Sequence, residues 1–143
     1  MKKITFDTGV KTYQINESGM LRFNPSDPNV YKRFKDLGAK IETLQAEYNE
    51  RSKNMTDGGE AIDLLAEYDH RMKSELSLAF GPDPDNDFDQ IFEGTNIMAI
   101  AGNGELIITN FLNAITPIVQ EGVKKYAKME AQKAVQEAKR AKQ

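Results

Sequence analysis

The sequence contains no cysteine and no tryptophan, and it has a single histidine. Without cysteine the chain builds neither a disulfide framework nor a thiolate metal site, and a reducing cytoplasm is its natural compartment. Since the sole imidazole, that of His70, sits in a charged helical face, the sequence gives no argument for a Ser-His-acid arrangement. We expect His70, within the charged run YDHRMK, to lie on the surface, and the acids Asp63 and Glu67 to be a solvated helix face. The sequence therefore predicts that the protein is not an enzyme and holds no cofactor.

Long hydrophobic runs are also missing. The longest stretch without charge, residues 106–120, is interrupted by polar residues and Pro117. It falls short of the about 18 apolar residues that span a bilayer. The first residues, MKKITFDTGV, have no apolar segment behind their lysines, so we expect no secretory signal. With 143 residues and 39% hydrophobic content, the chain is expected to be soluble and to bury its own core.

Two ligand-binding loops are excluded by their spacing. Residues 94–104 are rich in glycine but contain neither GxxxxGK[ST] nor GxGxxG, so they predict no phosphate site. Asp83, Asp85 and Asp87 occupy alternate positions, as in a calcium loop. However, Phe88 stands at the sixth position, where glycine is needed, and the twelfth lacks the bidentate Glu. We therefore predict no metal and interpret the acids as the cap of a short helix, residues 88–92.

Charge is distributed unevenly along the chain. The formal net charge is -3, but residues 124–143 contain seven Lys or Arg and two Glu, so this segment carries +5 and the remainder -8. A basic segment can bind nucleic acid through phosphates. Here Ala, Gln and Glu separate the cations, and no aromatic residue follows Tyr126 to stack on bases. The pattern favours a solvated or partner-binding helix.

The N-terminal residues predict a small β-hairpin region over residues 1–23. Runs rich in β-formers flank Asp7-Thr8-Gly9 in the segment KITFDTGVKTYQI, which predicts a hairpin that turns at Gly9. A second turn is expected at residues 16–19, and residues 20–23 are expected to add a third strand.

A helical hairpin is predicted over residues 28–80. Asp27 and Pro28, in LRFNPSDPNVYKRF, are typical of a helix cap and a first helical residue. A second start is expected near Asp57. Asp69 either pairs with a lysine and sets register, or rotates to the edge of the second helix. The first apolar face comprises Val30, Phe34, Leu37, Ile41, Leu44 and Tyr48, and the second comprises Ile62, Leu65, Met72, Leu76 and Ala79.

The rest of the chain predicts loops and a short helix over residues 81–104, followed by a helix over residues 105–126. Pro117 is expected to bend that helix or to make it start afresh. Residues 127–143 keep helical spacing through alanines alone, which predicts a basic helical tail that frays or orders on a partner. The predicted fold is thus mainly α, with a globular domain of residues 1–126 and a tail of residues 127–143.

The order of these motifs resembles the tail assembly chaperones of long-tailed phages and prophages of Gram-positive bacteria. The resemblance rests on FNPSDP before the first helix, on the small loop of residues 94–104, and on FLNAITPIV with its internal proline. It implies a non-enzymatic protein of the host cytoplasm, absent from the mature virion. Such a protein binds the tape measure protein, keeps it soluble and helps recruit the major tail protein.

Under this reading the partner surface includes the final helix and its tail, and self-association stays open because heptad patterns permit a hairpin or a dimer. No nucleic-acid or membrane partner is expected. Two other classes remain open: a tail or connector component of the virion, and a small nucleic-acid-binding regulator whose affinity falls steeply with salt. The predicted partner-binding residues are Phe111, Leu112, Ile115, Val119, Val123, Tyr126, Lys128, Lys133, Lys139 and Arg140.

Overall fold

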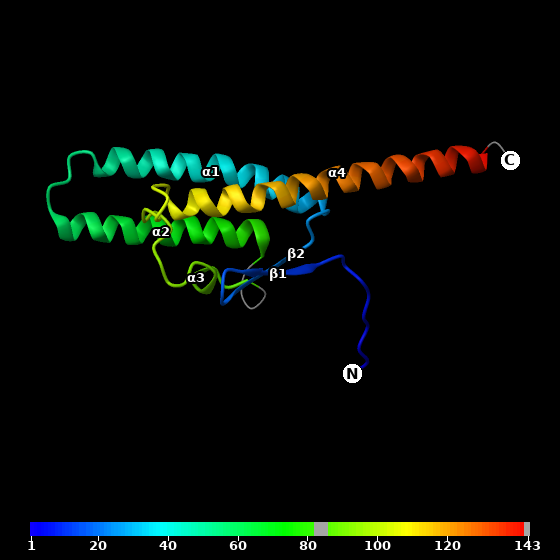
Figure 1. Ribbon diagram of the computed structural model, residues 1–143, viewed down its shortest axis with the longest axis horizontal. Helices are drawn as coiled ribbons and strands as arrows, with labels where there is room; N and C mark the ends of the chain where they lie inside the picture. The colour runs from blue at the N-terminus through cyan, green and yellow to red at the C-terminus, as the bar shows by residue number, and fades with distance from the viewer. Residues whose placement is uncertain (82–85, 142–143) are drawn as a thin grey trace.

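The computed structural model describes residues 1–81 and 86–141. Two strands come first, followed by four helices, and Figure 1 shows α1, α2 and the first half of α4 side by side, with the strands and α3 along one side of them. This arrangement confirms the mainly helical class with a small β-hairpin and a long C-terminal helix. The elements are β1 (Lys11–Ile15), β2 (Gly19–Phe23), α1 (Pro28–Ser52), α2 (Gly58–Phe80), α3 (Phe88–Ile91) and α4 (Ile107–Ala141).

The helical hairpin forms where its caps predict it. The Asp27 carboxylate accepts a hydrogen bond from the Asn29 amide, and Pro28 occupies the first turn of α1. Asp57 accepts from the amides of Gly59 and Glu60 at the start of α2. Each cap satisfies amides that have no partner inside the helix.

The buried face of α2 differs from the predicted one. Ile62 is 67% exposed, whereas Leu64 and Tyr68 are buried between the helices. The buried positions Leu64, Tyr68 and Met72 recur every four residues, so the face is turned slightly from the predicted one. Asp69 lies 3.0 Å from Lys73, one helical turn further along α2, which is the pairing that the sequence left open.

The strand pairing also differs from the prediction. β1 pairs antiparallel with β2 through the turn at residues 16–18, and residues 1–10 form no strand. The turn at Asp7 to Gly9 does form locally, since the Gly9 amide donates to Asp7 Oδ1 over 2.8 Å. Asn24 Nδ2 donates to the Thr8 carbonyl over 3.0 Å and so ties this turn to the segment after β2. The predicted strand before Gly9 is therefore wrong, and the predicted third strand is the second.

α4 is one helix through Pro117, which does not restart it. Proline removes the hydrogen bond to the carbonyl of Asn113, but both residues are exposed, so water can solvate that carbonyl. Further along, Gly122 is buried against the loop before α1. A Cβ atom placed on it would lie 1.9 Å from the Pro25 carbonyl oxygen. Gly122 therefore allows α4 to cross this loop at backbone contact.

One core joins all the elements, and Phe80 lies at its centre. Its ring centroid is 5.2 Å from that of Phe23 on β2 and 6.3 Å from that of Phe111 on α4. Phe34 and Phe88 add contacts from α1 and α3. Beyond Val123 every described residue of α4 is exposed, so the core ends there and the helix continues alone.

Candidate functional site

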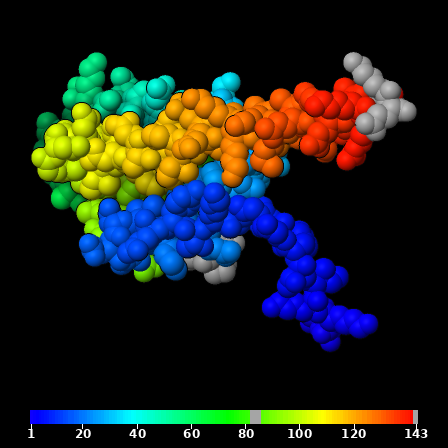
Figure 2. Space-filling view, turned by 45° about the vertical axis from the view of Figure 1, so that its right-hand side comes forward, coloured from blue at the N-terminus to red at the C-terminus, as the bar shows by residue number. Residues whose placement is uncertain are grey.

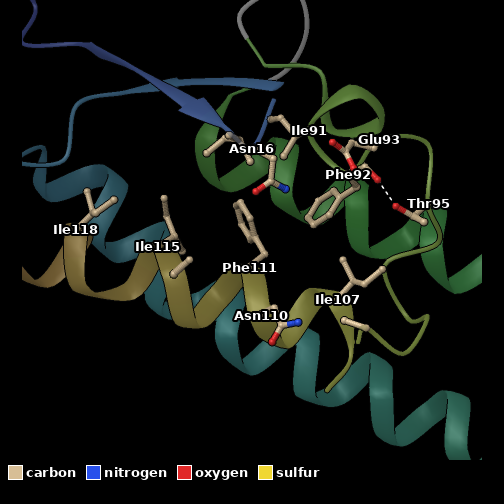
Figure 3. A pocket seen from close by; sticks show the side chains of 13 residues that line it. Asn16, Ile91, Phe92, Glu93, Thr95, Ile107, Asn110, Phe111, Ile115 and Ile118 are labelled. Carbon is tan, nitrogen blue, oxygen red and sulfur yellow. Dashed lines mark hydrogen bonds between the residues drawn. The ribbon is translucent and has the colours of Figure 1, made fainter. Parts of the chain in front are cut away.

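An apolar groove of about 420 Å³ lies between α4 and the end of β1 with α3. Figure 3 shows α4 along one side of it, with Phe111 and Ile115 pointing toward Asn16, Ile91 and Phe92 on the other. Its volume is in the range of small-molecule and peptide pockets. The residues that line the groove include Ile15, Glu93, Ile107, Phe111, Ile115 and Ile118.

A second depression continues this groove along β1. It is lined by Lys11 and Tyr13 from β1 and by Ile118, Glu121 and Lys125 from α4, so the two hollows share Ile118. Burial raises the pKa of the Tyr13 phenol above its ordinary value, and the nearby charge of Glu121 raises it further. We call the two hollows together the β1–α4 groove. It has Glu93 at one end, and its other end has the two lysines Lys11 and Lys125 together with Glu121.

The predicted partner-binding residues fall into three groups by burial. Phe111, Ile115 and Val119 are buried, and the Phe111 ring packs on Phe92 with centroids 5.2 Å apart. Their burial makes them part of the chain's own core, although Phe111 and Ile115 also form the floor of the groove. Leu112 and Val123 are half-buried. Tyr126 and the four cations Lys128, Lys133, Lys139 and Arg140 are exposed on the projecting part of α4.

The structure therefore does not bring the ten predicted residues together. Figure 2 shows the red end of α4 standing clear of the body, away from the yellow part that borders the core. On the projecting part Met129 and Val135 are exposed. Helical spacing places Val135 on the same face as the alanines Ala127, Ala131, Ala134 and Ala138.

The N-terminal segment is an exposed apolar feature that sequence reasoning missed as a site. We call residues 1–7 the arm. Its side chains Ile4 and Phe6 are 85% and 79% exposed, and Figure 1 shows the arm leaving the body beyond β1. The alternation of Ile4 and Phe6 with polar neighbours is the signal that predicted a strand here. The structure has no strand there, since the segment pairs with no other strand among the described residues.

The polar clusters of the body hold loops in place. Lys73 lies 3.0 Å from both Asp69 and Asp89, and it donates to the Thr95 carbonyl over 3.2 Å. Asp69 accepts from the Ile97 amide over 2.8 Å. These contacts fix the loop after α3 against α2. His70 is exposed, as predicted, and Asp63 is exposed beside Glu67, which pairs with Arg51.

The calcium-loop residues Asp83 and Asp85 lie outside the described residues, while Asp87 caps α3 through the amides of Asp89 and Gln90. In the described part of the chain, no group of three or more His, Asp or Glu side chains is placed to hold a metal ion. Over the same residues, none of the helices combines the length and apolar character required to cross a membrane.

Comparison with known proteins gives no relative to reason from: no family model, no curated protein and no solved structure matches this chain. The candidate binding surfaces of the molecule are the exposed helical tail, the β1–α4 groove and the arm.

Proposed function

We propose that this protein is a tail assembly chaperone of a long-tailed phage or prophage. In this role it is a non-enzymatic protein of the bacterial cytoplasm, absent from the mature virion. It binds the tape measure protein, keeps that long chain soluble and helps recruit the major tail protein. The order of sequence motifs first indicated this function, and one structural feature supports it.

That feature is the projecting part of α4, residues 124–141. It is a helix whose described residues are all exposed, and its face of alanines and Val135 has no partner within the part of the chain that the structure describes. By helical spacing, Lys128 and Lys139 border this face on one side, while Glu130 and Glu137 lie on the opposite side. An apolar stripe bordered by charges of both signs fits a helical partner, because such borders set the orientation of helix pairs.

The first experiment is co-expression with the tape measure protein of the same genome, followed by affinity capture and light scattering. We expect a soluble complex with several copies of this chain on each tape measure chain. Deletion of residues 128–143 removes the apolar stripe but no buried residue, so the body should fold and capture should fall by about tenfold or more, equivalent to about 1.4 kcal/mol.

Two matched point variants test the stripe itself. Val135→Asp places a charge within the stripe, whereas Gln136→Asp places the same charge one residue further, outside it. Only the first should weaken capture. Equal capture by both variants and by the truncated chain would refute the role of the tail. An insoluble tape measure protein, together with this chain in purified virions, would instead identify a structural tail component.

A further inference from the structure

We infer that the arm of one copy inserts into the β1–α4 groove of a second copy, where it pairs with β1 as a third strand, and that the exchange is reciprocal. This inference concerns self-association and does not depend on the proposed function. It rests on four features: the unpartnered arm, the free edge of β1, the match in length and charge, and the direction in which the arm leaves its own body.

The arm has the composition of a strand but lies in water. Ile4 and Phe6 are two residues apart, so in an extended chain they share one face, while Lys3 and Thr5 share the other. Two large apolar side chains at 85% and 79% exposure, on one face of an extended segment, leave an apolar surface that association would cover.

β1 provides the complementary edge. Among the described residues β1 pairs with β2 alone, so the amides and carbonyls on its other side have no strand partner. An open strand edge is a template for a further strand. This strand is flanked by α4, whose Ile107, Phe111, Ile115 and Ile118 give the groove an apolar floor. A third strand beside β1 would place alternate side chains on that floor.

Length and charge fix the orientation of the occupant. Residues 2–6 extend over about 16 Å at 3.3 Å per residue, which equals the span of the five residues of β1. Lys2, on the same face as Ile4, complements the end of the groove at Glu93, while Asp7 lies toward the other end, where Lys11 and Lys125 outnumber Glu121. Since β1 runs from Lys11 toward the Glu93 end, this alignment makes the arm antiparallel to β1.

The turn at residues 7–9, where the arm joins the body, favours insertion of the arm into a second copy over insertion into its own groove. Figure 2 shows the arm leaving the body and diverging from α4. The Thr8 carbonyl is held by Asn24 Nδ2 over 3.0 Å, and the Gly9 amide is held by Asp7 Oδ1 over 2.8 Å. Folding back onto its own β1 would require this turn to rearrange. Exchange between two copies keeps the turn and fills both grooves, as in a domain-swapped dimer with two-fold symmetry.

The test is the molar mass of the full chain by size-exclusion chromatography with light scattering over a range of concentrations. We expect twice the 16.1 kDa of one chain at high concentration. The double variant Ile4→Ser with Phe6→Ser should have the mass of one chain. A matched control, Ile62→Ser with Leu78→Ser, changes two residues of α2 that are 67% and 65% exposed, and it should remain dimeric.

Cysteine pairing identifies the groove that the arm occupies, because the chain has no cysteine of its own. One tagged protein has Ile4→Cys and a second, with a different tag, has Ala114→Cys in the groove. We expect a disulfide between the two proteins in a mixture, and its loss when the second also has Ile118→Asp, at a half-buried residue that lines both hollows. Circular dichroism checks that this variant stays helical.

Three results would overturn the inference. The first is a full chain that has the mass of one chain at every concentration. The second is a double-cysteine chain, Ile4→Cys with Ala114→Cys, that forms only an intramolecular disulfide, because the arm then occupies its own groove. The third is a dimer that survives the double serine variant of the arm, because another surface then holds the copies together.

Discussion

At the scale of single residues, the buried side chain of Asn86 joins β2 to the end of α2. It is 2% exposed, and its Oδ1 accepts from the Arg22 amide over 2.6 Å. Its Nδ2 donates to the carbonyls of Arg22 and Phe80, each over 3.0 Å, and lies 3.3 Å from that of Gly81. One amide side chain thereby connects β2 to the C-terminal end of α2, where carbonyls have no partner inside the helix.

Replacing this amide with a carboxylate should destabilise the protein. In Asn86→Asp the group that donates to the carbonyls becomes an acceptor, so buried carbonyls lose their partner. We expect the free energy of unfolding to fall by about 1–3 kcal/mol in urea titrations at neutral pH. Asn113→Asp makes the same change at an exposed position and should have little effect. Equal stability of the two variants would contradict this role for Asn86.

The caps at Asp27, Asp57 and Asp87 could be predicted from sequence, because each acts on an amide two or three residues away. Asn86 could not be predicted, because the Arg22 groups that it binds are 64 residues away. Local hydrogen bonds leave a pattern in the sequence, whereas a hydrogen bond closed by tertiary folding leaves none.

At the scale of elements, Gly122 controls how closely α4 approaches the loop before α1. Gly→Ala in a helix interior ordinarily stabilises it, because alanine has less backbone freedom to lose. At Gly122 the new Cβ would lie 1.9 Å from the Pro25 oxygen and 2.4 Å from its carbonyl carbon. A backbone contact this short cannot be relieved by a side-chain rotation, so α4 must shift.

We therefore expect Gly122→Ala to lower the free energy of unfolding by about 1–3 kcal/mol, the range of overpacked sites. Gly38→Ala on α1 is the matched control, because its Cβ would meet nothing within 4 Å. It should raise the free energy of unfolding by about 0.4–1 kcal/mol. Thermal and urea unfolding of both variants measure the difference, and a stabilising Gly122→Ala would show that the crossing is looser than described.

Among the elements, the helices could be predicted because their apolar spacing and caps agree with each other. The choice of paired strands could not be predicted, because the sequence has three candidate strands and the hairpin uses only two of them. Sequence favours the turn at Gly9 as much as the turn at residues 16–18, and packing against Phe80 selects the strands whose residues Leu21 and Phe23 enter the core. The face of α2 likewise depends on contact with α1.

At the scale of the whole molecule, one core holds residues 11–123, and the arm and the tail extend from it. The β1–α4 groove could not be predicted, because β1, α3 and α4 meet there only through the fold. The exposed tail could be predicted, because residues beyond Tyr126 lack large apolar side chains apart from Met129 and Val135. Composition alone thus predicts which part of the final helix stays outside the core.

Hydrogen exchange should divide α4 at this boundary. Amides of residues 111–122 are in the core-packed part and should exchange only as the body unfolds. Amides of residues 127–141 belong to a helix with no tertiary contact, so we expect them to exchange orders of magnitude faster. Mass spectrometry of peptic peptides measures both. Uniform protection along α4 would mean that the tail is covered by another molecule.

The close crossing at Gly122 also makes α4 a lever. The Pro25 carbonyl is its fulcrum, the core holds the part of α4 before Gly122, and the part beyond Gly122 runs to Ala141. That part is about 28 Å long at 1.5 Å per residue, so a tilt of about 10° at the fulcrum moves its tip by about 5 Å. A small rearrangement in the core, such as the filling of the adjacent groove, would thus be amplified into a large displacement of the basic tip.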